Sequence, residues 1–205
     1  SRGWPMRSSL LVRSILPAIL AFAAQPALAE GTVPPAPDVA AVAALGPVPK
    51  GRLSDAAVPL AYRLDLSIDP EAESYAGRAQ IDVTLAAPAR YIDMHGLDLA
   101  VSAASATIGG KTYRGHWTQL DETGVARLVF DEVLPAGPAT LDFAYTHAFN
   151  DGPAGLFRVK VGDRWFAWSQ FESIDARQAF PSFDQPGFKV PFTVTLRTRP
   201  GQAAI

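Results

Sequence analysis

The chain has 205 residues, of which 48% are hydrophobic and 19% charged, and its formal net charge is −2 at pH 7. Acidic and basic residues are intermixed without a Lys/Arg cluster, so nucleic acid is not an expected partner. There is no cysteine, which excludes thiol catalysis, Cys-ligated zinc and iron–sulfur clusters.

The first 29 residues have the pattern of an export signal. Residues 1–5 precede the first methionine, Met6, and we interpret them as upstream of the native start. Arginines near Met6 are followed by an apolar run at 15–24 and a small-x-small cleavage site at 27–29. Pro17 interrupts the run, which is shorter than the ~20 apolar residues that a span needs. We therefore expect cleavage after this site, no stable membrane span thereafter, and an exported protein, periplasmic or extracellular.

Residues 30–50 are rich in Pro, Ala, Gly and Val without turn-bounded alternation, which is typical of a flexible linker. Residues 51–205 then form the expected domain. Apolar and polar residues alternate there at 62–69, 79–85, 126–130 and 141–145. Period two with one polar face indicates antiparallel strands half covered by a core. Pro- and Gly-containing turns separate these strands, at 69–70, 87–88, 109–110, 135–137 and 150–153. The pattern predicts an all-β antiparallel sandwich or open barrel.

The segment 165–192 carries the most specific signal. Its aromatic start, 165–168, reads as a buried strand. Gln170 and Glu172 then flank Phe171, and in an extended chain alternate side chains share a face. A carboxylate beside a primary amide suits a cationic amine, because the carboxylate supplies charge and the amide oxygen a further acceptor. The plain alternative for such a Gln-x-Glu pair is a solvated strand face.

Further backbone structure is expected after this pair. Residues 173–179 are polar and predict a short helical turn with Ser173 as N-cap. A second turn is expected at 184–187, followed by a strand in which apolar residues alternate from 190 to 196.

This segment resembles the end of the N-terminal domain of zinc aminopeptidases of the aminopeptidase N type, where T-Q-F-E-x-x-D-A-R-x-A-F-P-C-F-D-E-P is usual. The departures are Ser169 for Thr, Ser182 for Cys and Gln185 for Glu. The matching residues are Gln170, Phe171, Glu172, Asp175, Ala176, Arg177, Ala179, Phe180, Pro181, Phe183, Asp184 and Pro186.

Weaker similarities to the same family occur in order at 58–62, 75–81, 134–137, 149–151 and 155–158. The resemblance implies a saddle-shaped, mainly antiparallel β-domain that packs on a catalytic domain. It also implies that Glu172 pairs with the α-ammonium group at the N-terminus of a peptide substrate and that Gln170 helps to orient it. Zinc is implied for the complete enzyme.

The catalytic motifs of that family are missing. Its metal site needs H-E-x-x-H on a helix, where two imidazoles hold the metal and the Glu activates water. The histidines here, His95, His116 and His147, form no such motif, and G-x-M-E-N is also absent. Three histidines could in principle converge on a metal in space, and a pair of carboxylates for glycoside hydrolysis is not excluded by sequence. No G-x-S-x-G elbow of a serine hydrolase occurs.

We therefore expect the N-terminal β-domain of an exported zinc metalloaminopeptidase, ending before the catalytic domain, without catalytic residues or zinc ligands of its own and inactive alone. The alternative is a stand-alone secreted β-sandwich that binds protein, peptide or carbohydrate. Trp165, Phe166 and Trp168 favour that alternative if they form a binding platform, although core packing also explains aromatic residues.

Overall fold

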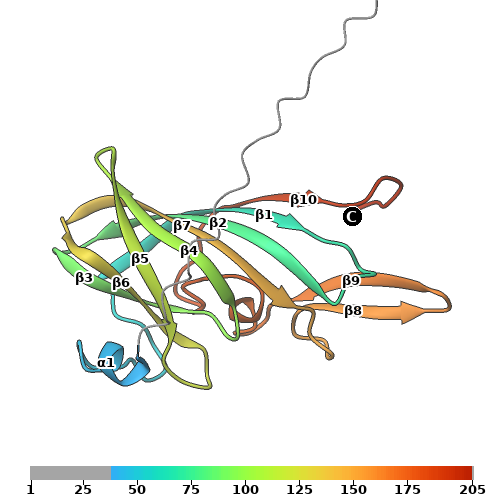
Figure 1. Ribbon diagram of the computed structural model, residues 1–205, viewed down its shortest axis with the longest axis horizontal. Coiled ribbons are helices and arrows are strands. Elements are labelled where there is room, and N and C mark those ends of the chain that lie inside the picture. Colours follow the sequence, from blue (N-terminus) through green and yellow to red (C-terminus); the bar gives the residue numbers. More distant parts are fainter. Residues whose placement is uncertain (1–37, 205) are drawn as a thin grey trace, which may run out of the picture. The chain divides into compact units, whose positions relative to one another are not determined.

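Ten strands make up most of what the computed structural model describes, residues 38–204 (Figure 1). The other elements of this part are a short helix, α1 (Val39–Ala43), and a 3₁₀ turn, η1 (Ala176–Gln178). The strands are β1 (Ala57–Ser67), β2 (Ser74–Leu85), β3 (Ala89–His95), β4 (Ala100–Ile108), β5 (Lys111–Gln119), β6 (Val125–Leu134), β7 (Gly137–Ala148), β8 (Gly155–Val161), β9 (Arg164–Gln170) and β10 (Phe192–Arg197).

Eight of the strands form one sheet in the order β10-β1-β2-β7-β4-β5-β6-β3, and β8 pairs with β9 in a separate hairpin. Every pairing is antiparallel except that of β10 with β1. The large sheet curls into an open half-barrel (Figure 1). The predicted all-β fold, an antiparallel open barrel with a saddle-like sheet, is thus confirmed.

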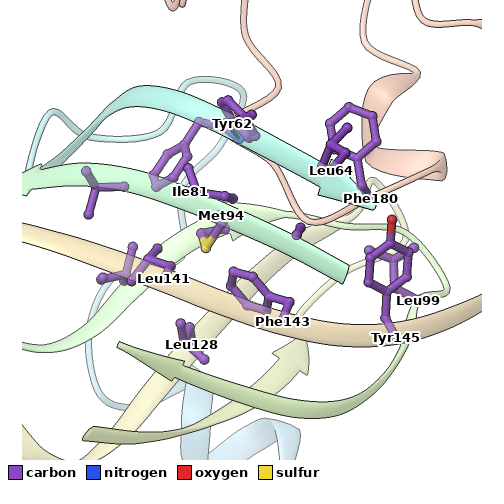
Figure 2. Packing of buried hydrophobic residues seen from close by; sticks show 14 of the residues in the cluster. Tyr62, Leu64, Ile81, Met94, Leu99, Leu128, Leu141, Phe143, Tyr145 and Phe180 are labelled. Carbon is purple, nitrogen blue, oxygen red and sulfur yellow. Dashed lines mark hydrogen bonds between the residues drawn. The ribbon is translucent and has the colours of Figure 1, made fainter. Parts of the chain in front are cut away.

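The core lies on one face of this sheet, as the alternating sequence predicted. Ile81, Leu128 and Leu141, from three strands, are fully buried, and Met94 at the end of β3 joins them (Figure 2). Gly77 on β2 leaves room for the ring of Tyr145 on β7: a Cβ there would lie 2.3 Å from Cζ of Tyr145. Removal of these apolar side chains from water is the main force that holds the sheet curled.

The opposite face carries charges that pair across neighbouring strands. Arg63 on β1 makes a bidentate ion pair with Asp82 on β2, at 2.7 and 2.9 Å. Arg197 on β10 pairs in the same way with Asp65 on β1. The hydrogen bonds from these guanidinium groups hold the pKa of Asp82 and of Asp65 below the usual range. Because the pairs lie in solvent, they set strand register more than they add stability.

Residues 38–50 fall within the segment predicted as a flexible linker, yet they form α1 and a turn held by a buried arginine. Arg127 on β6 is completely buried. Its guanidinium donates to the carboxylate of Asp93 at 2.7 and 3.1 Å and to the carbonyl oxygens of residues 42, 46 and 47 at 3.0–3.1 Å. It also stacks on the ring of Tyr91, 4.0 Å away. The carbonyl partners lie 80–85 residues earlier in the sequence, so composition alone could not reveal this contact.

The turn predicted at 109–110 is confirmed between β4 and β5. Gly109 and Gly110 both have positive φ, 57° and 82°, which favours glycine over other residues. Alternation did not identify β3, β4, β5 and β8. No helix within residues 38–204 has the length and apolar character needed to cross a bilayer. The predicted signal peptide lies outside the described residues.

Candidate functional site

The predicted amine-binding pair sits at the base of the β8–β9 hairpin. Gln170 is the last residue of β9, and Glu172 lies in the turn that follows it. The aromatic segment 165–168 is a strand, as predicted, but it is not buried: 55% of Trp168 is exposed. It belongs to a two-stranded hairpin without a covering layer among residues 38–204, a context that local pattern does not reveal.

The Glu172 carboxylate is exposed and free. It has neither a hydrogen bond nor an ion pair with any residue of the described part, 38–204. The Gln170 amide makes only a long contact, 3.5 Å, from Nε2 to the backbone oxygen of Glu172. Between them, the ring of Phe171 meets the buried ring of Phe180 edge-on, with 5.6 Å between centroids.

Arg177 is the nearest candidate in sequence to neutralise Glu172, but its bonding is satisfied elsewhere. Its Nε donates to Oδ2 of Asp184 at 3.0 Å, and its two terminal nitrogens donate to the backbone oxygens of Asp184 and Thr123, each at 2.9 Å. Both side chains of the ion pair are 9% exposed. Arg177 thus ties the segment after Glu172 to the β5–β6 turn and leaves the carboxylate of Glu172 available.

The turn after Glu172 differs in detail from the prediction. The helical turn is η1, and Asp175 occupies its N-cap position, so the prediction of Ser173 as N-cap is wrong. The Asp175 side chain instead accepts from Nε2 of Gln178 at 2.8 Å. Gln178 in turn accepts from Nδ2 of Asn150 at 3.0 Å, which joins η1 to the start of the hairpin.

The second predicted turn is present at 185–187. Oε1 of Gln185 accepts from the backbone N–H of Leu53 at 2.9 Å. A glutamine suits this contact because its amide oxygen is an acceptor without a charge to desolvate.

His95 supports the site from inside, a role that sequence reasoning missed. It is fully buried at the end of β3, where its backbone pairs with that of Ser182. Its Nδ1 accepts from the backbone N–H of Asp184 at 3.1 Å. Burial, with a contribution from the charge of Arg177, lowers the pKa of His95 to about 4, so the ring is neutral. Only contact between two distant segments reveals this role, and the sequence held no signal for it.

The histidines do not form a metal site. His116 pairs with Asp131 at 2.8 Å, and Nε2 of His147 donates to the backbone oxygen of Leu97 at 3.1 Å. Within residues 38–204 no group of three or more His, Asp or Glu side chains is arranged to hold a metal ion. The residues described here therefore do not fit a zinc ion.

Fold and site together define an all-β domain that presents a free carboxylate at the base of a hairpin and has no metal centre in its described part. The family model for the Peptidase M1 N-terminal domain matches residues 58–205. The chain belongs to the M1 peptidase family and contains the N-terminal domain of such a peptidase.

Curated relatives agree with this assignment. The chain is 33% identical to Aminopeptidase M1-B of Oryza sativa subsp. japonica over 151 residues, 72% of this chain and 17% of that protein. It is 33% identical to Aminopeptidase M1 of Arabidopsis thaliana, over 71% of this chain and 18% of that protein. It is 29% identical to Endoplasmic reticulum aminopeptidase 1 of Homo sapiens, over 76% of this chain and 18% of that protein. The chain thus spans less than a fifth of the length of these relatives.

Proposed function

We propose that this domain anchors the N-terminus of a peptide in the active site of an exported zinc aminopeptidase. Glu172 receives the α-ammonium group of the substrate, and the Gln170 amide oxygen accepts one of its hydrogens. The observation that carries this proposal is the free Glu172 carboxylate beside Gln170, on a segment that Arg177 holds in place through Asp184 instead of through Glu172.

A carboxylate in this position explains selection for a free amine. A charge-assisted hydrogen bond between ammonium and carboxylate is stronger than a neutral one. Once a second domain covers the site, the carboxylate loses water, and a substrate without the cation leaves it unpaired at a cost. An acylated N-terminus is therefore rejected, which is the property that distinguishes an exopeptidase acting at the N-terminus.

The zinc chemistry belongs to a catalytic domain outside this chain. The M1 family implies zinc in the complete enzyme, and residues 38–204 contain no group of side chains that could hold it. The residues of this chain bind and orient the substrate amine, and the zinc site supplies the hydrolytic chemistry. We further propose export, on the basis of the leader pattern in residues 1–29.

Substitution of Glu172 in the complete enzyme tests the proposal. Loss of one charge-assisted contact is worth ~1.5–3 kcal/mol, so Glu172→Ala lowers kcat/KM on free-amine substrates by one to two orders of magnitude. The kcat/KM of Glu172→Gln lies between those of the parent enzyme and Glu172→Ala, because glutamine keeps an acceptor without the charge. Gln170→Ala costs less, since it removes a neutral acceptor. An unchanged kcat/KM for Glu172→Ala contradicts the proposal.

A further inference from the structure

The face of the large sheet that is turned away from the core contains a hollow. Five adjacent strands, β10, β1, β2, β7 and β4, form it, and its volume is about 500 Å³. Small-molecule sites have volumes of about 300–1,000 Å³. The loop that follows Glu172 packs on the other face of the sheet, where Phe180 meets the buried ring of Tyr62 with 6.4 Å between centroids. The hollow is therefore separate from the amine-binding pair.

The strand register arranges the side chains of this hollow in two rows. Cross-strand partners lie opposite each other on the same face of a sheet. From β10 to β4, the first row is Thr195, Asp65, Arg78, Ala144 and Ala103, and the second row is Thr193, Arg63, Gln80, Asp142 and Ser105. In the first row the long side chain of Arg78 is followed by two methyl groups. These small side chains leave open space beside the guanidinium group.

Arg78 differs from the other cations of these rows in its bonding. Arg63 pairs with Asp82, and the neighbour of Arg78 in the first row, Asp65, pairs with Arg197. The Arg78 guanidinium has neither an ion pair nor a hydrogen bond with any residue in the range 38–204. A guanidinium presents a planar fork of N–H donors that matches a carboxylate in a bidentate geometry. Arg78 is thus placed to receive the carboxylate of a ligand.

Asp142 supplies the opposite charge on the neighbouring strand. Its Oδ1 accepts from Nε2 of Gln80 at 2.5 Å, and its Oδ2 has no hydrogen-bond partner in the described part of the chain. An amide partner does not neutralise the carboxylate, so an ammonium group in the hollow gains a charge-assisted hydrogen bond. Asp142 lies diagonal to Arg78 in the register of β2 and β7, and such neighbours are ~7–8 Å apart. The two free charges therefore flank one small space.

We propose that this hollow binds a small zwitterion, with its carboxylate on Arg78 and its ammonium group on Asp142. A simple anion uses only the first of these contacts and a simple cation only the second. A molecule with both charges a few ångströms apart uses both, and free amino acids and dipeptides have this chemistry. The proposal goes beyond the amine-anchor function and does not depend on it. Under that function, a free amino acid is also what the complete enzyme releases, so the hollow is a site for product away from the chemistry.

Titration of this chain with three matched small molecules tests the proposal, with the backbone amides followed by ¹⁵N–¹H NMR. Glycine carries both charges, glycinamide carries only the ammonium group, and N-acetylglycine carries only the carboxylate. Sodium chloride keeps the ionic strength equal in the three titrations, because salt screens exposed charges. Exposed ion pairs are weak, so the expected Kd for glycine is roughly 1–50 mM.

The expected result is that glycine shifts the amide resonances of the two rows, and that glycinamide and N-acetylglycine bind there at least about threefold more weakly. Glycylglycine separates the two sources of a zwitterion: a lower Kd for glycine assigns the hollow to free amino acids, and a lower Kd for glycylglycine assigns it to short peptides. Equal affinity for the three matched molecules overturns the proposal. So does the absence of shifts in these rows at about 100 mM glycine.

Substitution of Arg78 identifies the residue that holds the carboxylate. Arg78→Gln raises the Kd for glycine at least about threefold, whereas Arg90→Gln, the same change of charge on β3 at the other edge of the sheet, leaves it unchanged. Both side chains are exposed, and the amide spectrum verifies that each variant is folded. An unchanged Kd in Arg78→Gln contradicts the proposal. Shifts confined to the segment around Glu172 also contradict it while they support the amine anchor, so the two proposals fail separately.

Discussion

Arg177→Met is the substitution whose cost follows most directly from the geometry. The side chains of Arg177 and Asp184 are each only 9% exposed, and the guanidinium also satisfies two backbone oxygens. Methionine keeps most of the volume but leaves the Asp184 carboxylate buried without its cation. Breaking a buried pair in this way costs ~3–5 kcal/mol. For a chain of this size each kcal/mol lowers the melting temperature by ~2–4 °C, which gives a decrease of about 6–20 °C.

Thermal unfolding of this chain, followed by circular dichroism, measures the effect. Asp184→Asn completes a double-mutant cycle. Because the two groups interact, the melting temperature of the double variant decreases by less than the sum of the decreases in the two single variants. Glu172→Ala is the matched control: its carboxylate has no partner among residues 38–204, so its melting temperature stays close to that of the parent. If Glu172→Ala destabilises the chain as much as Arg177→Met, Glu172 is a structural residue and the reasoning fails.

Three further predictions follow from other contacts. The folded-state pKa of His95, about 4 against an ordinary 6.5, means that the unfolded chain binds the proton more readily. The contribution of neutral His95 to the free energy of unfolding is therefore fully present above pH 6.5, and up to ~3 kcal/mol of it is lost as the pH falls to 4. Urea titrations at several pH values measure this dependence. His95→Gln makes it less steep, whereas His116→Gln does not. Arg127→Met leaves Asp93 without its cation and frees the segment around α1, so limited proteolysis cuts residues 38–50 first; resistance equal to that of the parent contradicts this role. The purified chain releases no amino acid from aminoacyl-anilides with or without zinc, and metal-dependent turnover that co-purifies with it overturns the assignment of the chemistry to another domain.

The fold was predictable where a strand lies between core and water. β1, β2 and β7 alternate because one face packs on the core and the other is solvated. β4 did not show this pattern, since its side chains are small and mostly exposed or half-buried. The aromatic start of β9 was read as buried from its apolar run, but β9 belongs to a separate two-stranded hairpin, where its side chains are half-buried or exposed.

The site was predictable as a pair of residues but not as a structure. Gln170 and Glu172 stood out through local spacing and family resemblance. The contact of Arg177 with Asp184 and the contact of His95 with the same loop depend on chain segments that meet only after folding. The clamp of Arg127 on the carbonyl oxygens near α1 is of the same kind, because backbone acceptors carry no sequence signature.

The central claim is that Glu172 recognises the free amine, and the ratio of kcat/KM for a free peptide to that for its N-acetylated form measures this recognition. In the complete enzyme we predict that Glu172→Ala reduces the ratio by one to two orders of magnitude, the equivalent of a contact worth ~1.5–3 kcal/mol, through loss of activity on the free peptide. His116→Gln, which removes the pairing with Asp131 across β5 and β6, away from the hairpin, serves as the control and leaves the ratio nearly unchanged. A ratio in Glu172→Ala equal to that of the parent enzyme contradicts the claim.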